Sequence, residues 1–210
     1  MLLSLRTLRQ SGGGRHKSLC RGVRNEQLSA KGCALEYDTS IIRPEIRFED
    51  VKIRGVGYDE ERRKEILKAL RFLHAREIMA ANVYKCQIKS KACKLNTWLT
   101  AGMASEMTHV SDFQTKLYEF GAKPSKSRFV FWFAGYVFGF GSRILGEERM
   151  LRTGVWVEEE AVKHYQEVLD RVDWDDETRA FVEKDQQDEY AHIERWKTLL
   201  GEPGYGCRQD

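Results

Sequence analysis

Six side chains in this sequence are of types that could bind metal ions, and two pairs of them have the three-residue spacing of neighbours on a helix. They are four glutamates and two histidines: Glu77, Glu106, His109, Glu158, Glu189 and His192. Each histidine follows a glutamate by three residues, so each Glu-x-x-His pair would lie on one face of a helix. Carboxylate oxygens combined with imidazole nitrogens favour iron or manganese. The pattern therefore predicts metal chemistry at these six residues.

Five predicted helices have to position these residues. Start and stop signals divide the chain after residue 57 into helices at about 59–91, 92–120, 127–145, 147–172 and 175–200. Asp59 is the expected N-cap of the first helix, and Gly121 and Pro124 end the second. All helices except the third carry an apolar stripe at three- and four-residue steps, and a carboxylate interrupts each stripe. We therefore expect the six candidate ligands to face the protein core.

Burial of four glutamates requires a compensating positive charge, because an unpaired buried carboxylate is costly. No Lys or Arg lies on the four stripes, whereas two metal ions would supply the charge. One Glu from each of two helices and a Glu-x-x-His pair from each of two others is the arrangement of ferritin-like dimetal bundles. The sequence thus predicts an all-α protein with a ferritin-like four-helix bundle. The alternative, surface ion pairs on amphipathic helices, requires a wrong helical phase on all four helices.

The third predicted helix is different because it is apolar nearly all round. Residues 129–142 (FVFWFAGYVFGFGS) are uncharged and lie between Arg128 and Arg143. A helix that crosses a bilayer needs about 20 apolar residues, so this segment is too short. Aromatic residues flanked by arginine suit insertion at the level of the lipid headgroups, and we expect a short hydrophobic interfacial helix. A central core helix or an oligomer interface is the alternative.

The 210 residues, 41% hydrophobic and 32% charged, suffice for one domain. Their net charge of +3 is uneven, because residues 1–32 contain seven basic side chains and one acid, Glu26. Such acid depletion with interspersed leucine and arginine is typical of a mitochondrial presequence, with a disordered basic arm as the alternative. The remainder has a net charge of −3, which does not indicate nucleic-acid binding. We expect a presequence over 1–32, an extended segment over 33–57, the ferritin-like domain over 58–200 and a flexible tail over 201–210.

The cysteines are odd in number and include no Cys-x-x-Cys pair: Cys20, Cys33, Cys86, Cys93 and Cys207. This pattern predicts neither a disulfide framework nor a thiolate metal site. It is compatible with a reducing compartment such as the mitochondrial matrix.

Five motifs resemble those of the demethoxyubiquinone hydroxylases, mitochondrial di-iron proteins with a ferritin-like fold. They are HAREIMAANVYKCQ (74–87), EMTH (106–109), GSRILGEERM (141–150), VEEEAVKHY (157–165) and DEYAH (188–192). The resemblance implies that the six candidate ligands hold two iron ions, with Glu106 and Glu158 as bridging ligands. The His-Tyr pair of the family corresponds to His164 and Tyr165, for which the resemblance implies a role in proton or electron transfer.

The resemblance also implies an activity, 5-demethoxyubiquinone hydroxylation in ubiquinone biosynthesis. One oxygen atom of O2 would enter the quinone ring, with electrons derived from NADH. The family further implies peripheral binding at the matrix face of the mitochondrial inner membrane and a lipid-binding partner that presents the isoprenoid-tailed quinone. Two alternatives are a non-catalytic ferritin-like accessory subunit of a mitochondrial membrane complex and an iron-handling or peroxide-reducing protein.

Several positions depart from the family pattern. Arg76, Met79 and Cys86 replace glycines, which predicts a narrower substrate channel beside Glu77. The chain stops ten residues after the fifth predicted helix, where family members continue into another hydrophobic helix, so we expect quinone docking and membrane attachment to differ. Asp185, one turn before the last Glu-x-x-His pair, is expected either to orient a ligand or to be a helix-end polar residue.

Overall fold

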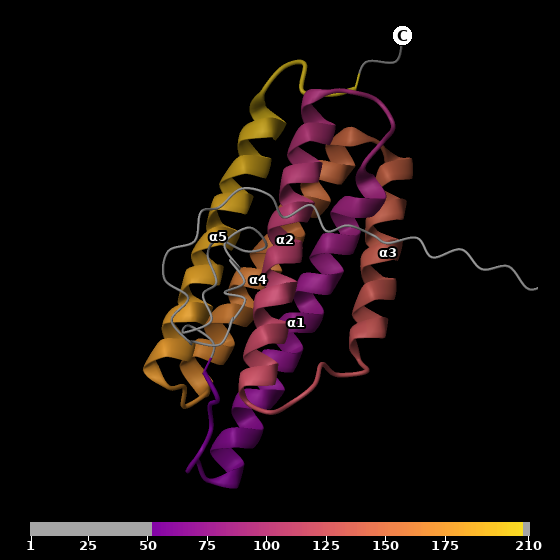
Figure 1. Cartoon of the computed structure of the whole chain (residues 1–210). Helices are drawn as coiled ribbons and strands as arrows, with labels where there is room; N and C mark the ends of the chain where they lie inside the picture. The colour runs from indigo at the N-terminus through magenta and orange to yellow at the C-terminus, as the bar shows by residue number, and fades with distance from the viewer. Residues whose placement is uncertain (1–51, 208–210) are drawn as a thin grey trace, which may run out of the picture.

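The four ligand-bearing segments form a helical bundle in the computed structural model, which describes residues 52–207 (Figure 1). All regular secondary structure in that range is helical: α1 (Glu60–Gln87), α2 (Lys94–Glu119), α3 (Arg128–Leu145), α4 (Glu147–Arg171) and α5 (Asp176–Gly201). Helices α1, α2, α4 and α5 form the bundle, and α3 packs outside it against α1 and α4. The predicted all-α class and five-helix order are confirmed.

Local hydrogen bonds define the ends of α1. The Asp59 carboxylate accepts from the backbone N–H of Arg62 at 2.9 Å, which confirms the predicted N-cap. The helix ends at Gln87, four residues before the predicted end at position 91. Beyond it, the Asn96 side chain accepts from the Lys89 N–H at 3.0 Å and donates to the Lys89 carbonyl at 2.7 Å. These contacts hold the connection to α2 in a non-helical conformation. No Gly or Pro occurs there, so the sequence did not predict this helix end.

Two glycines allow α3 to lie directly on the backbone of α1. A Cβ atom at Gly135 would stand 2.4 Å from the Met79 carbonyl oxygen, and one at Gly139 would stand 2.5 Å from that of Val83. Only glycine permits this approach. The opposite face of α3 is exposed, with large apolar side chains 40% or more accessible at Phe129, Val130, Trp132, Phe133, Tyr136, Val137, Phe138, Phe140, Ile144 and Leu145. The central-core alternative for α3 is therefore wrong.

None of the described helices has the length and apolar character needed to cross a membrane. This agrees with the expectation that the aromatic segment on α3 is too short to span. The predicted presequence and most of the predicted extended segment lie outside the described residues.

Two apolar clusters fill the bundle, one toward each end. The first cluster includes the largest buried side chains Ile66, Leu70, Leu73, Phe113, Leu117, Phe120 and Tyr165. The second includes Tyr84, Leu95, Leu99, Met150 and Trp196. The candidate ligands lie between the two clusters along each bundle helix, so the apolar core is interrupted by one polar layer.

The segment after α5 returns to the start of α2, at the top of Figure 1. Cys207 is paired with Cys93 in a disulfide whose Cα atoms are 5.2 Å apart, and the Cys207 N–H donates to the Glu147 carboxylate at 3.1 Å. The Tyr205 carbonyl accepts from the Leu95 N–H at 3.1 Å. The prediction of no disulfide framework is therefore wrong for this pair, because the fold joins two cysteines that are 114 residues apart. The flexible tail expected from position 201 also makes these contacts, which sequence alone does not predict.

Candidate metal centre

Each bundle helix contributes to the polar layer. Helix α1 supplies Glu77, α4 supplies Glu158, and α2 and α5 each supply a Glu-x-x-His pair. All six side chains are buried, and none is more than 3% exposed. The helical phase inferred from the apolar stripes is therefore correct on all four helices, and the alternative of surface ion pairs is wrong.

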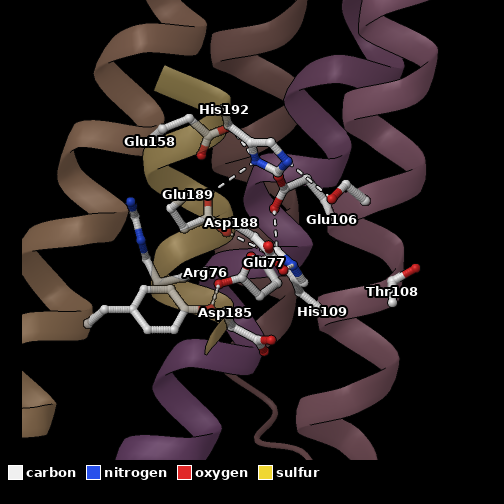
Figure 2. A network of polar contacts seen from close by, with 12 residues as sticks. Arg76, Glu77, Glu106, Thr108, His109, Glu158, Asp185, Asp188, Glu189 and His192 are labelled. Carbon is white, nitrogen blue, oxygen red and sulfur yellow. Dashed lines mark hydrogen bonds and ion pairs between the residues drawn. The ribbon is translucent and has the colours of Figure 1, made fainter. Parts of the chain in front are cut away.

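The donor atoms gather into two overlapping groups (Figure 2). One group consists of Glu77, Glu106, His109 and Glu189, and the other of Glu106, Glu158, Glu189 and His192. Within each group the donor atoms lie within 4.8 Å of one another. His109 Nδ1 is 3.0 Å from Glu189 Oε1, and His192 Nδ1 is 2.9 Å from Glu106 Oε1.

Two carboxylates, Glu106 and Glu189, belong to both groups. Glu158 belongs to only one of them, so the geometry does not support the expected bridging role of Glu158. The reason lies in the pairing of helices, because the two Glu-x-x-His helices place their glutamates between the two histidines. Glu189, together with Glu106, would therefore be able to reach both ions.

Several of these atoms fit a bound cation. Glu106 and Glu189 have buried carboxylate oxygens, and His109 and His192 have buried Nδ1 atoms, that no well-aligned hydrogen bond within residues 52–207 satisfies. Buried polar atoms are nearly always satisfied in native proteins, and exceptions call for an unseen partner. Carboxylate oxygens and imidazole nitrogens suit iron or manganese. The donor set fits two such ions.

The electrostatics of the layer indicate the same occupant. Burial and the neighbouring carboxylates raise the pKa of Glu106 and of Glu158 well above the usual range. Burial opposes ionisation of Glu189 too, but close ion-pair contacts with both histidines outweigh it and lower the pKa of Glu189 to about 2. Burial alone would lower the pKa of His109, but close contacts with the Glu189 and Glu77 carboxylates outweigh it and raise the pKa above its usual value. Without metal, protons bound to the carboxylates balance the negative charge of the layer, which neutralises those carboxylates as ligands. Two metal cations would balance the same charge and leave every carboxylate ionised.

Two buried tyrosines support the layer from opposite sides. Tyr165 donates to Glu77 Oε1 at 2.8 Å, and Tyr84 donates to Glu158. The Trp196 indole N–H in turn donates to the Tyr84 hydroxyl at 3.0 Å. Tyr84 and Trp196 lie on the apolar stripes of the sequence, but their hydrogen bonds to the site were not predicted. The sequence feature that could have predicted these bonds is an aromatic residue seven positions, or two helical turns, after a candidate ligand on the same face.

Other predicted residues lie in different surroundings. His164 is half-buried, and its ring packs edge-on against Phe72 with the centroids 5.1 Å apart. His74, one turn before Glu77 and not among the predicted ligands, is also buried, and burial lowers its pKa. Asp185, which the sequence left open, is fully buried one turn before Glu189.

Arg76 is a buried cation that the apolar stripes of the sequence did not predict. Its side chain is 8% exposed, and its guanidinium donates to the Val157 carbonyl at 3.2 Å, next to Glu158. Met79 is also buried, 3.8 Å from the same guanidinium through its sulfur. These side chains occupy the junction of α1 and α4, where the sequence predicts a narrowed channel.

The outward nitrogens of the two histidines have different neighbours. His109 Nε2 lies 3.4 Å from Asp188 Oδ2, and His192 Nε2 lies 3.1 Å from Ser105 Oγ. Such outer hydrogen bonds fix the ring orientation of metal-binding histidines. Both imidazoles are thereby held with Nδ1 toward the carboxylates.

Comparison with known proteins adds a family and a relative. The family described as ubiquinone biosynthesis protein COQ7 matches residues 64–198, which include all six candidate ligands. The 3-demethoxyubiquinol 3-hydroxylase of Alcanivorax borkumensis is 25% identical over 134 residues, which make up 63% of this chain and 61% of that protein. The match thus spans about three fifths of that curated relative.

Proposed function

The chain belongs to the ubiquinone biosynthesis protein COQ7 family, and on this premise we propose that it is a di-iron 5-demethoxyubiquinone hydroxylase. The proposed reaction inserts one oxygen atom of O2 into a demethoxyubiquinone-type ring. Two bound irons would supply O2 activation, with electrons derived from NADH. The relative's printed name, 3-demethoxyubiquinol 3-hydroxylase, supports this substrate class.

The observation that carries the proposal is the pair of overlapping donor groups in a fully buried layer. All six side chains would hold the two irons, and Glu106 and Glu189 belong to both donor groups. The helices fix these side chains before any ion binds, so little reorganisation is required. Tyr165 and Tyr84 hold the terminal carboxylates in place through their hydroxyl groups. In this proposal Tyr165 also holds the proton of the expected relay, and His164 remains a relay candidate through its place in the family motif.

Helix α3 supports entry of a lipid-soluble substrate from a membrane surface. Its outward face carries Phe133, Val137 and Ile144 at exposures of 60%, 49% and 69%, next to the junction of α1 and α4. Exposed apolar patches of this kind mark interaction sites. We place the protein peripherally on the matrix side of the mitochondrial inner membrane, after import by the presequence over 1–32. A lipid-binding partner of ubiquinone biosynthesis would present the isoprenoid-tailed quinone there.

The proposal is tested by measuring metal per chain, anaerobic reduction and reaction of the reduced protein with O2. We expect two irons per chain in the parent and fewer in Glu106→Ala, because Glu106 belongs to both donor groups. Glu167→Ala, at an exposed position of α4, is the matched control and retains both irons. A folded parent without bound metal would contradict the proposal and favour the accessory-subunit alternative. Hydroxylation of a demethoxyubiquinone analogue by the iron-loaded parent completes the test.

Membrane contact is tested separately by sedimentation with vesicles of anionic phospholipid. The double substitution Phe133→Glu and Val137→Glu should reduce the bound fraction, because it places charge on the exposed apolar face of α3. Equal binding of the parent and the variant would contradict this part of the proposal.

A further inference from the structure

A third cluster of potential ligands lies on the outer side of His109. His109, Asp185 and Asp188 bring donor atoms within 4.8 Å of one another, from α2 and from the turn of α5 that precedes Glu189 (Figure 2). The Asp188 side chain is 46% exposed, whereas Asp185 is fully buried. The cluster therefore connects solvent with the buried layer.

The Asp185 carboxylate is the observation that calls for a ligand. Neither of its oxygens has a hydrogen-bond partner within residues 52–207, although the side chain is completely buried. Lys184 forms an ion pair with it at 3.8 Å, but on a side chain that is 70% exposed, and the other nearby group that favours its charged form is the His109 imidazole. An exposed ammonium at that distance compensates a buried carboxylate weakly. A cation seated between Asp185 and Asp188 would provide the missing partner.

The imidazole of His109 joins this cluster to the buried layer. Its Nδ1 is 3.0 Å from Glu189 on the inner side, and its Nε2 is 3.4 Å from Asp188 on the outer side. A neutral imidazole has one nitrogen free to bind an ion, because the other carries the proton. His109 can therefore serve an outer ion or an inner ion, and not both at once.

We propose that Asp185, Asp188 and His109 form an outer divalent-cation site through which metal ions reach the buried centre. An incoming ion binds the two aspartates and Nε2 of His109. It then moves inward to the layer of glutamates, where Nδ1 of the same ring takes over. This inference rests on the proposed metal centre, but it concerns how that centre fills.

The experiment uses the full chain stripped of metal, with Mn²⁺ and Co²⁺ as probes. Bound Mn²⁺ is counted by electron paramagnetic resonance, and the rate of Co²⁺ loading is followed by stopped-flow absorbance at low ionic strength. The variants are Asp185→Asn and Asp188→Asn, and the matched control is Glu194→Gln, which removes a charge from an exposed position of the same helix. Asp188 is partly exposed, so its variant is expected to fold even if substitution of Asp185 perturbs packing.

We expect the parent to bind two Mn²⁺ ions tightly in the layer. A third ion should bind weakly through Asp185 and Asp188 alone, because an inner ion then occupies His109. Both aspartate variants should lose the third ion and load Co²⁺ about tenfold more slowly, because the site no longer attracts cations at its entrance. The Glu194→Gln control should match the parent in both measurements.

Other results overturn the inference in distinguishable ways. Two ions in the parent, with equal loading rates in all variants, would leave the metal centre standing and reject the outer site. Weaker inner binding in Asp188→Asn alone, without a third ion in the parent, would mean that Asp188 only orients His109. A parent that binds no ion would contradict the proposed function itself.

Discussion

The two halves of the buried layer contain the same types of candidate ligand, one glutamate and one histidine each, but different side chains support them. The tryptophan half consists of Glu158, His192, Tyr84, Trp196 and Ser105. The aspartate half consists of Glu77, His109, Tyr165, Asp185 and Asp188. Each half has a glutamate held by a tyrosine and a histidine held by an outer oxygen. The outer oxygen differs: His192 faces the neutral Ser105 hydroxyl, whereas His109 faces the partly exposed Asp188 carboxylate.

The tryptophan half therefore contributes to the stability of the fold, whereas the aspartate half connects the layer with solvent. In the tryptophan half, a fully buried indole and a chain of hydrogen bonds fill the space behind the ligands. In the aspartate half, Asp185 is buried without a hydrogen-bond partner in the described chain. Its carboxylate destabilises the fold and places negative charge beside His109. We therefore expect loss of Trp196 to destabilise the protein and loss of the Asp185 charge to stabilise it.

The largest loss of stability is expected from Trp196→Ala. The substitution leaves a large cavity in the second apolar cluster and removes the indole hydrogen bond to Tyr84. It should lower the free energy of unfolding of the metal-stripped protein by about 3 to 5 kcal/mol, measured by urea denaturation. Trp132→Ala, at an exposed position of α3, is the control and should change it by less than about 1 kcal/mol. Equal losses in the two variants would contradict the assigned packing.

An opposite effect is expected from Asp185→Asn. In the metal-stripped protein, burial raises the pKa of Asp185 from 3.8 to about 7, with Glu77 and Asp112 adding to the rise and His109 and Lys184 opposing it. A raised carboxyl pKa means that the folded state binds the proton more tightly, so stability falls as the pH rises from about 4 to about 7. The variant should be more stable than the parent by about 2 to 4 kcal/mol at pH 8.

The advantage of Asp185→Asn should shrink as the pH falls from 7 toward 4, because both folded and unfolded parent chains then carry a protonated Asp185. Melting temperatures across this range test the sign. An advantage that is independent of pH would show that the carboxylate charge is not the cause.

The disulfide should stabilise the end of the bundle that holds the tryptophan half. Cys207→Ser opens a covalent loop with a sequence separation of 114 residues and should cost about 2 to 4 kcal/mol in unfolding free energy under oxidising conditions. Reductant should lower the melting temperature of the parent and leave that of Cys207→Ser unchanged. Cys86→Ser, which removes the free cysteine of residues 52–207, should behave as the parent does.

The smallest expected difference separates the two tyrosines. Tyr84→Phe removes a donor to Glu158 and an acceptor for Trp196, so it should cost about 2 kcal/mol. Tyr165→Phe removes only the donor to Glu77 and should cost about 1 kcal/mol. Equilibrium denaturation of both variants in one buffer measures the gap, and a reversed order would contradict the two-bond role of Tyr84.

Residues close together along one helix could be assigned from the sequence. The Glu-x-x-His pairs and the apolar stripes identified all six members of the layer, because a fixed 3.6-residue period decides which side chains share a face. The same local reasoning located the N-cap at Asp59 and the start of α4 at Glu147. It also recognised α3 as unusual from its uncharged aromatic run.

Contacts between helices were decided by the tertiary structure. The sharing of Glu106 and Glu189, the tyrosine supports, the burial of Arg76 and the pairing of Cys93 with Cys207 join segments that are distant along the chain. The period of a helix says which side chains face inward, but not which neighbouring helix they meet or how far the two helices slide along each other. The sequence by itself therefore determined the set of candidate ligands. Helix packing decided their pairing, their charge balance and the side on which the layer reaches solvent.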